Sequence, residues 1–125
     1  MWNLLLAGLG GFLGAASRYG LSTFTQRLAG SPAFPYGTLV VNVLGCLLIG
    51  LAAGYGETRG VLGPGARVFL LAGVLGGFTT YSAFGFETVD LLHSGQTGTA
   101  LLNVGLQLVL GIGAVWGGLL LGRMA

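Results

Sequence analysis

A run of hydroxyl-bearing residues, Thr79 to Ser82, lies in the middle of a long apolar stretch, after two adjacent glycines, Gly76 and Gly77. Such residues weaken a continuous helix at this point. A broken helix leaves unpaired carbonyls at the end of its first half and unpaired amides at the start of its second half. Carbonyls suit a hard cation such as sodium, whereas amides and hydroxyls suit an anion. The run therefore predicts a site for ions.

Isolated polar residues occur in two other apolar stretches. Thr38 and Asn42 are one helical turn apart, and so are Asn103 and Gln107, so each pair shares a helix face. Polar groups at membrane depth are costly and usually face the bundle interior or a cavity. Two interpretations stay open for Asn103 and Gln107. They either line a polar path or make hydrogen bonds between helices, which are worth about 0.6 kcal/mol on average.

The aromatic residues near the run and Arg18 also allow two interpretations each. Tyr81 and Phe84 either pack in the core or turn their positive ring edges toward an anion, and their clustering with hydroxyl groups favours the anion. Arg18 lies about 24 Å along its helix from Trp2, so we expect it near an interface. There it either attracts anions into a vestibule or contacts lipid phosphates.

The elements that must position these residues are membrane-spanning helices. The chain of 125 residues is 54% hydrophobic and only 6% charged, whereas an average soluble domain carries about 25% charged residues. Four apolar stretches, at about 2-27, 36-56, 67-93 and 99-122, each reach the roughly 20 residues that a helix needs to cross the bilayer. We expect an all-α membrane protein, with the whole of residues 1-125 in a single domain of four transmembrane helices whose third helix is broken.

Glycine spacing predicts close packing of these helices. The pairs Gly10 with Gly14, Gly50 with Gly54 and Gly113 with Gly117 are each four residues apart, and small residues let helix backbones approach in a membrane. Four packed helices leave little room for an aqueous route within one chain. A homodimer is therefore expected.

The few charges leave the membrane orientation open and argue against nucleic acid as a partner. The five arginines are scattered singly and form no basic patch. With four spans, three arginines fall on the side of the termini and two on the opposite side, which is almost no positive-inside bias. We expect the chain to insert in both orientations. The alternative is a single orientation that other features determine.

Three segments together resemble a known family, the small fluoride channels of the CrcB or Fluc type. They are residues 10–19 (GGFLGAASRY), 37–45 (GTLVVNVLG) and 73–84 (GVLGGFTTYSAF). Each is weak alone, but their combination, in this order and in a four-span chain of this length, is specific. The resemblance covers the whole chain.

This resemblance implies a multi-pass protein of a prokaryotic plasma (inner) membrane that exports fluoride passively and so relieves fluoride toxicity. It implies an antiparallel, dual-topology homodimer with two pores. One structural sodium ion (Na+) at the dimer interface would be held by the backbone carbonyls of Gly76 and Thr79. Arg18 would lie in the vestibule. The positions that match the pore lining are Asn42, Tyr81, Ser82, Phe84, Thr38, Asn103 and Gln107.

The sequence departs from the family pattern at two places. Tyr81 stands where phenylalanine is usual, so its ring edge is kept but its hydroxyl needs a partner. Asn103 and Gln107 stand where tyrosine and serine are frequent.

Rival functions fit the residues less well. A small dual-topology multidrug or other small-solute transporter driven by protons needs a deep ionisable group, and most of the first span contains no carboxylate. A non-transporting assembly subunit would need only the glycine faces, which leaves the polar break unexplained. An intramembrane hydrolase needs a base near its nucleophile, but the only histidine, His93, is far from Ser82. We therefore expect a channel and no enzyme.

Overall fold

The computed structural model describes the whole chain, residues 1–125, as a bundle of helices. Four helical stretches are long and apolar enough to cross a membrane, which confirms the predicted all-α membrane architecture. They run a few residues beyond the predicted spans, because helices continue from the hydrocarbon into the headgroup region. The four stretches are α1 (Trp2–Ala29), α2 (Tyr36–Arg59), a composite third span (Pro64–His93) and α6 (Thr97–Met124).

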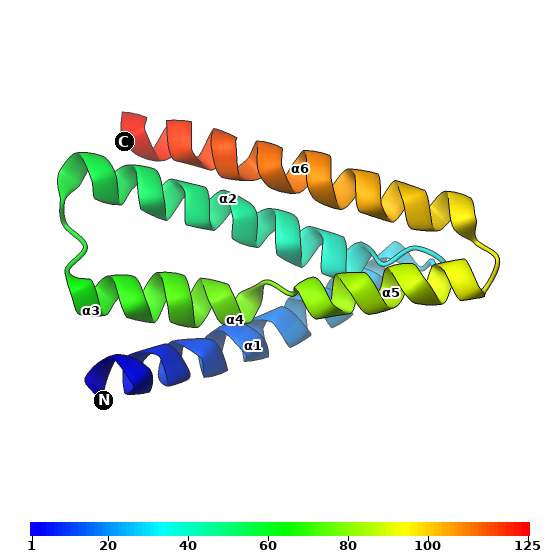
Figure 1. Ribbon diagram of the computed structural model, residues 1–125, viewed down its shortest axis with the longest axis horizontal. Helices are drawn as coiled ribbons and strands as arrows, with labels where there is room; N and C mark the ends of the chain where they lie inside the picture. Colours follow the sequence, from blue (N-terminus) through cyan, green and yellow to red (C-terminus); the bar gives the residue numbers. More distant parts are fainter.

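Short connections place both termini at the same end of the bundle, together with the connection between α2 and the third span (Figure 1). Helices α1 and α2 end at Gly30 and Gly60, and the turn before α6 contains Gly95. These three glycines have left-handed backbone conformations, with φ of 65°, 61° and 77°. Glycine adopts this conformation without a steric penalty from a side chain, so each helix stops sharply.

The third span is a series of helical segments interrupted once. It begins with α3 (Pro64–Arg67), continues as the π-helix η1 (Val68–Leu75) and ends its first half with α4 (Gly76–Phe78). Thr79 and Thr80 then adopt extended conformations, with ψ of 156° and 113°. The second half is α5 (Tyr81–His93). The structure thus confirms that the third span is discontinuous and locates the break at two residues.

The break lets the third span change its packing partner. The first half, η1 and α4, contacts mainly α1, whereas α5 contacts mainly α6. In Figure 1 the third span runs between α1 and α2, and α6 lies beyond α2 at the end that carries the termini. Helix α2 packs along α6. The break therefore occurs where the third span passes from its contact with α1 to its contact with α6.

Glycines allow the close approach of α1 to the first half of the third span. A Cβ atom at Gly10 would overlap the carbonyl oxygen of Phe69, and one at Gly14 would overlap that of Val74. Gly73 and Gly77 face the same contact from the other side. This agrees with the predicted packing face on α1.

Glycines also pack α2 against α6, but on α6 the predicted pair is wrong. Gly50 and Gly54 make the close contact expected of them, here with backbone atoms of α6, whereas a Cβ at Gly113 or Gly117 would meet no atom of the chain within 4 Å. The contacts on α6 come instead from a neighbouring pair, Gly118 and Gly122. The four-residue spacing is present twice on α6, and only the three-dimensional arrangement selects the pair that faces α2.

Replacing Gly14 with alanine should lower the melting temperature in detergent solution. The added Cβ would overlap the backbone of Val74, which cannot rotate away as a flexible side chain would. Overpacking of this kind costs about 1–3 kcal/mol. Gly20→Ala is the matched control, because Gly20 is on the same helix and has no atom within 4 Å of the added Cβ. Equal melting temperatures for the two variants would contradict the close backbone contact.

Candidate functional site

Asn42 on α2 holds the break in the third span through two hydrogen bonds to the backbone of Thr80. Its Nδ2 donates to the Thr80 carbonyl at 3.0 Å, and its Oδ1 accepts from the Thr80 N–H at 2.8 Å. In a continuous helix this N–H would donate to the carbonyl of Gly76. The Thr80 N–H therefore donates to Asn42 and not to the Gly76 carbonyl.

Thr80 itself starts α5 as its N-cap. The Thr80 Oγ1 accepts a hydrogen bond from the Ala83 N–H at 3.2 Å, the usual geometry for a threonine at this position. In a continuous helix the Ala83 N–H would donate to the carbonyl of Thr79. Two side chains thus divert the donors of the Gly76 and Thr79 carbonyls, the same two that the sequence resemblance proposed for a cation.

A cavity of about 340 Å³, here named the central cavity, lies at the break. Gly76 and Thr79 both line it, together with the aromatic residues Tyr81 and Phe84. The two rings form an edge-to-face pair with centroids 5.8 Å apart. The Tyr81 side chain is 85% exposed on the single chain, so the cavity borders an outer face of the bundle.

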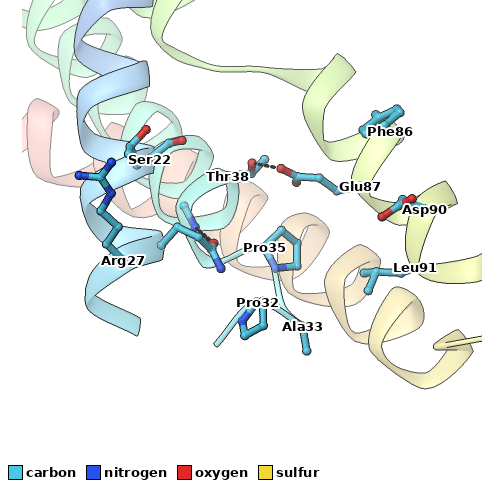
Figure 2. Close-up of a pocket in the computed structure, with 13 residues that line it drawn as sticks. Ser22, Arg27, Pro32, Ala33, Pro35, Thr38, Phe86, Glu87, Asp90 and Leu91 are labelled. Atoms are coloured by element: carbon cyan, nitrogen blue, oxygen red, sulfur yellow. Dashed lines mark hydrogen bonds between the residues drawn. The ribbon is translucent and has the colours of Figure 1, made fainter. Parts of the chain in front are cut away.

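A larger cavity of about 510 Å³, the outer cavity, lies near the end of the bundle opposite the termini. In Figure 2, Glu87 on α5 points across it toward Thr38 on α2, and Arg27 on α1 lines it with its charged group turned away from Glu87. Thr38 Oγ1 donates a 2.6 Å hydrogen bond to Glu87 Oε1. Asp90, one turn after Glu87, also lines this cavity.

A third, smaller cavity of about 190 Å³, the inner cavity, has lining residues in common with each of these two. It shares Thr38 and Glu87 with the outer cavity, and it shares Thr80 with the central cavity. Arg18, predicted near an interface, lines this inner cavity. Shared lining residues thus relate the three cavities, from one end of the bundle to the helix break.

Gln26 on α1 positions the start of α2, and sequence reasoning missed it. Its Nε2 donates to the carbonyls of Ser31 and Phe34 at 2.7 and 3.0 Å. Its Oε1 accepts from the Gly37 N–H at 3.1 Å. These bonds hold the connection beside Thr38. The only signal in the sequence was a glutamine in the last turns of an apolar helix, which does not indicate its partners.

The structure separates the predicted residues of the fourth span. Gln107 lines the central cavity, and its Oε1 accepts from Asn42 Nδ2 at 3.1 Å. Asn103 is completely buried and lines none of the three cavities described above. Its Nδ2 donates to Thr88 Oγ1 on α5 at 3.0 Å, a hydrogen bond between helices.

Ser82 lies at the start of α5 and is exposed on the single chain. Its Oγ is 3.3 Å from Thr80 Oγ1, a hydrogen bond in which either hydroxyl can donate. The polar pattern of the sequence does not single out two residues of the site, Thr80 and Thr88. Their roles come from contacts that only the packed helices make.

These features define a class of protein, an integral membrane protein with four spans, a discontinuous third helix and cavities beside the break that carry a few polar side chains. Residues 5–119 match the family described as CrcB-like protein, Camphor Resistance (CrcB). The chain belongs to this family, which confirms the resemblance seen in the three sequence segments.

Relatives that are named "Fluoride-specific ion channel FluC" align over almost the whole chain. One from Nitratidesulfovibrio vulgaris is 47% identical over 99% of this chain and 99% of its own length. One from Paracoccus denitrificans is 48% identical over 97% of this chain and 94% of its own length. A third, from Methylobacillus flagellatus, is 41% identical over 99% of this chain and 97% of its own length. With its four spans, the chain is a multi-pass protein of a prokaryotic plasma membrane.

Replacing Thr80 with valine should lower the melting temperature, because valine keeps the branched shape but cannot accept the hydrogen bond from Ala83. Loss of an N-cap costs about 1 kcal/mol. Thr80→Ser is the matched control, since serine keeps the oxygen atom and should melt close to the wild type. A Thr80→Val protein as stable as Thr80→Ser would show that the cap does not support the break.

Proposed function

We propose that the protein is a passive, fluoride-selective channel through which fluoride leaves the cell, which relieves fluoride toxicity. The observation that carries this proposal is the set of three cavities with shared lining residues, from the outer cavity past Arg18 to the break at Thr79 and Thr80. The names of the relatives support the same function. A passive channel needs a continuous polar path and no reacting groups, so we propose no enzymatic activity.

The groups at the break suit a small anion. The first turn of α5 offers the positive end of a helix, and the Ser82 hydroxyl is close to it. Tyr81 and Phe84 can present positive ring edges without a full charge. A narrow passage lined with such donors would favour fluoride over the larger chloride ion. Arg18 would attract anions toward this passage from the inner cavity.

The polar residues on α2 and α6 contribute in different ways to the proposed pore. Thr38 borders the outer and inner cavities, whereas Asn42 and Gln107 border the central cavity. Both hydrogens of Asn42 Nδ2 already have acceptors, Thr80 and Gln107. Asn42 therefore shapes the wall of the passage. Asn103 lies behind this wall, where it supports α5.

We also propose that two copies form an antiparallel homodimer in the membrane, with the central cavities near the interface. In a single chain the Tyr81 side chain is 85% exposed at mid-depth, where its hydroxyl would meet lipid. Unsatisfied polar groups are costly there, and a second copy would cover them. The even distribution of arginines supports insertion in both orientations, which an antiparallel dimer of one sequence requires.

A sodium ion at this interface would fit the carbonyl groups of the break. Gly76 and Thr79 lose their helical donors to side chains, and both line the central cavity. Backbone carbonyls are ligands for hard cations, and a dimer would double the number that one chain supplies. The structure has no group of His, Cys, Asp or Glu that could hold a metal ion. When bound, the ion would supply a positive charge that holds the broken helices of both copies together.

Purified protein in liposomes should release fluoride and retain chloride. An ion-selective electrode would measure both, with protein-free liposomes as the control. Phe84→Ile removes a ring edge from the central cavity while keeping an apolar side chain, so it should reduce the fluoride efflux rate about tenfold or more, the effect of losing ~1.4 kcal/mol of stabilisation. Release of chloride as fast as fluoride, or of neither ion, would refute the proposed function.

Two variants, each with added positive charge at a different end of the bundle, would test the dual topology. Lysines at Val61 and Met124 add positive charge at the end with the termini, and lysines at Ser94 and Gln96 add it at the other end. Each variant should insert in one orientation only. Each alone should then give little fluoride efflux from cells, and co-expression of both should restore it. Full efflux from either variant alone would contradict the antiparallel dimer.

A further inference from the structure

A series of side-chain hydrogen bonds leaves the helix break, crosses to two other helices and returns to α5. Its first part has defined donors and acceptors. The Thr80 backbone N–H can only donate, so Asn42 must turn Oδ1 toward it and Nδ2 away. Asn42 Nδ2 is a donor, so Gln107 must present Oε1 to it. The Gln107 Nε2 group is thereby directed away from Asn42.

The other end of the series is equally determined. Thr88 Oγ1 has a single hydrogen, which it donates to the Phe84 carbonyl at 2.7 Å. Thr88 Oγ1 must therefore accept from Asn103, which turns Nδ2 toward it at 3.0 Å. The Asn103 Oδ1 atom is left facing the other way.

The two parts end in complementary atoms. Gln107 Nε2, a donor, and Asn103 Oδ1, an acceptor, are both buried and neither has a hydrogen-bond partner within the chain. The two residues are one turn apart on α6, the spacing at which glutamine and asparagine side chains interact along a helix. A hydrogen bond between them would satisfy both atoms at once.

We propose that Asn42, Gln107, Asn103 and Thr88 form one hydrogen-bond relay that positions Tyr81 and Phe84 in the pore. Gln107 donates to Asn103 and closes the relay. Both of its ends attach to the backbone that carries the two rings, at Thr80 and at Phe84. The relay therefore fixes the position of α5 along its axis relative to α2 and α6. Its members act as positioning residues through the hydrogen bonds that they make to α5 and to one another.

This inference rests on the proposed fluoride pore. It assigns the binding of the anion mainly to donors at the helix break that lie outside the relay. Within the relay the bonds of Asn42 and Asn103 support α5. The donors that stay available at the break are the Ser82 hydroxyl, the first backbone amides of α5 and the second hydrogen of Gln107 Nε2. Changes in the relay should thus alter fluoride passage by moving Tyr81 and Phe84.

The first experiment uses Thr88, whose hydroxyl touches Asn103 and the Phe84 carbonyl. Thr88→Val keeps the shape but breaks both bonds, so the ratio of fluoride to chloride efflux from liposomes should fall about fivefold to tenfold. Thr88→Ser keeps the hydroxyl and should restore most of the ratio. Thr58→Val is the matched control, because Thr58 makes the same bond to a carbonyl one turn back, at the far end of α2. An unchanged ratio in Thr88→Val would overturn the proposal.

The second experiment tests the closing contact with a double-mutant cycle. Gln107→Leu removes the donor to Asn103, and Asn103→Leu removes the acceptor; the bonds to Asn42 and Thr88 that are also lost occur on both sides of the cycle and cancel. If the relay is closed, the double variant should lose clearly less stability than the sum of the two single variants. Additive losses would show that the two side chains do not interact. Melting does not depend on transport, so a wild type that fails to release fluoride would refute the pore and leave this cycle informative.

Discussion

The pairing of Asn42 with both backbone groups of Thr80 is the interaction on which the rest of the structure depends. A bilayer offers no water to a broken helix, so the freed N–H and C=O groups need partners within the protein. One side-chain amide supplies an acceptor and a donor in the same plane, at 2.8 and 3.0 Å. With these bonds, the third span can stop and restart at mid-depth at a tolerable cost.

The break has consequences at both of its ends. Before it, Gly76 and Thr79 lose the donors that a continuous helix would give their carbonyls. After it, α5 starts with a capped and positively polarised turn beside Ser82 and the Tyr81–Phe84 pair. A carbonyl-rich end and an amide-rich end therefore lie next to each other, and this proximity is the physical basis for proposing a cation and an anion at one place.

The glycine faces allow this arrangement to be compact. Gly10 and Gly14 bring α1 against the first half of the third span, while Gly118 and Gly122 bring α6 against α2. Because lipid provides little hydrophobic driving force between helices, close backbone packing must hold them together. The break then moves α5 from α1 toward α6, where Thr88 meets Asn103 and the second half gains its own support.

Much of this protein follows from the order of its residues alone. Low charge and four apolar stretches determine a four-span membrane protein, because each stretch has the length that a bilayer requires. The polar run in the third span predicts a discontinuity, since its glycines and hydroxyl-bearing residues weaken a continuous helix, and the structure confines the break to Thr79 and Thr80. The three family segments determine the family.

What the sequence could not decide was which partner each polar group would choose. Gly113 and Gly117 have the same spacing as the pair that packs, and Asn103 has the same position on its helix face as Gln107, yet they end in different environments. Helix rotation and the distances between α2, α5 and α6 decide this, and both arise only when the spans pack together.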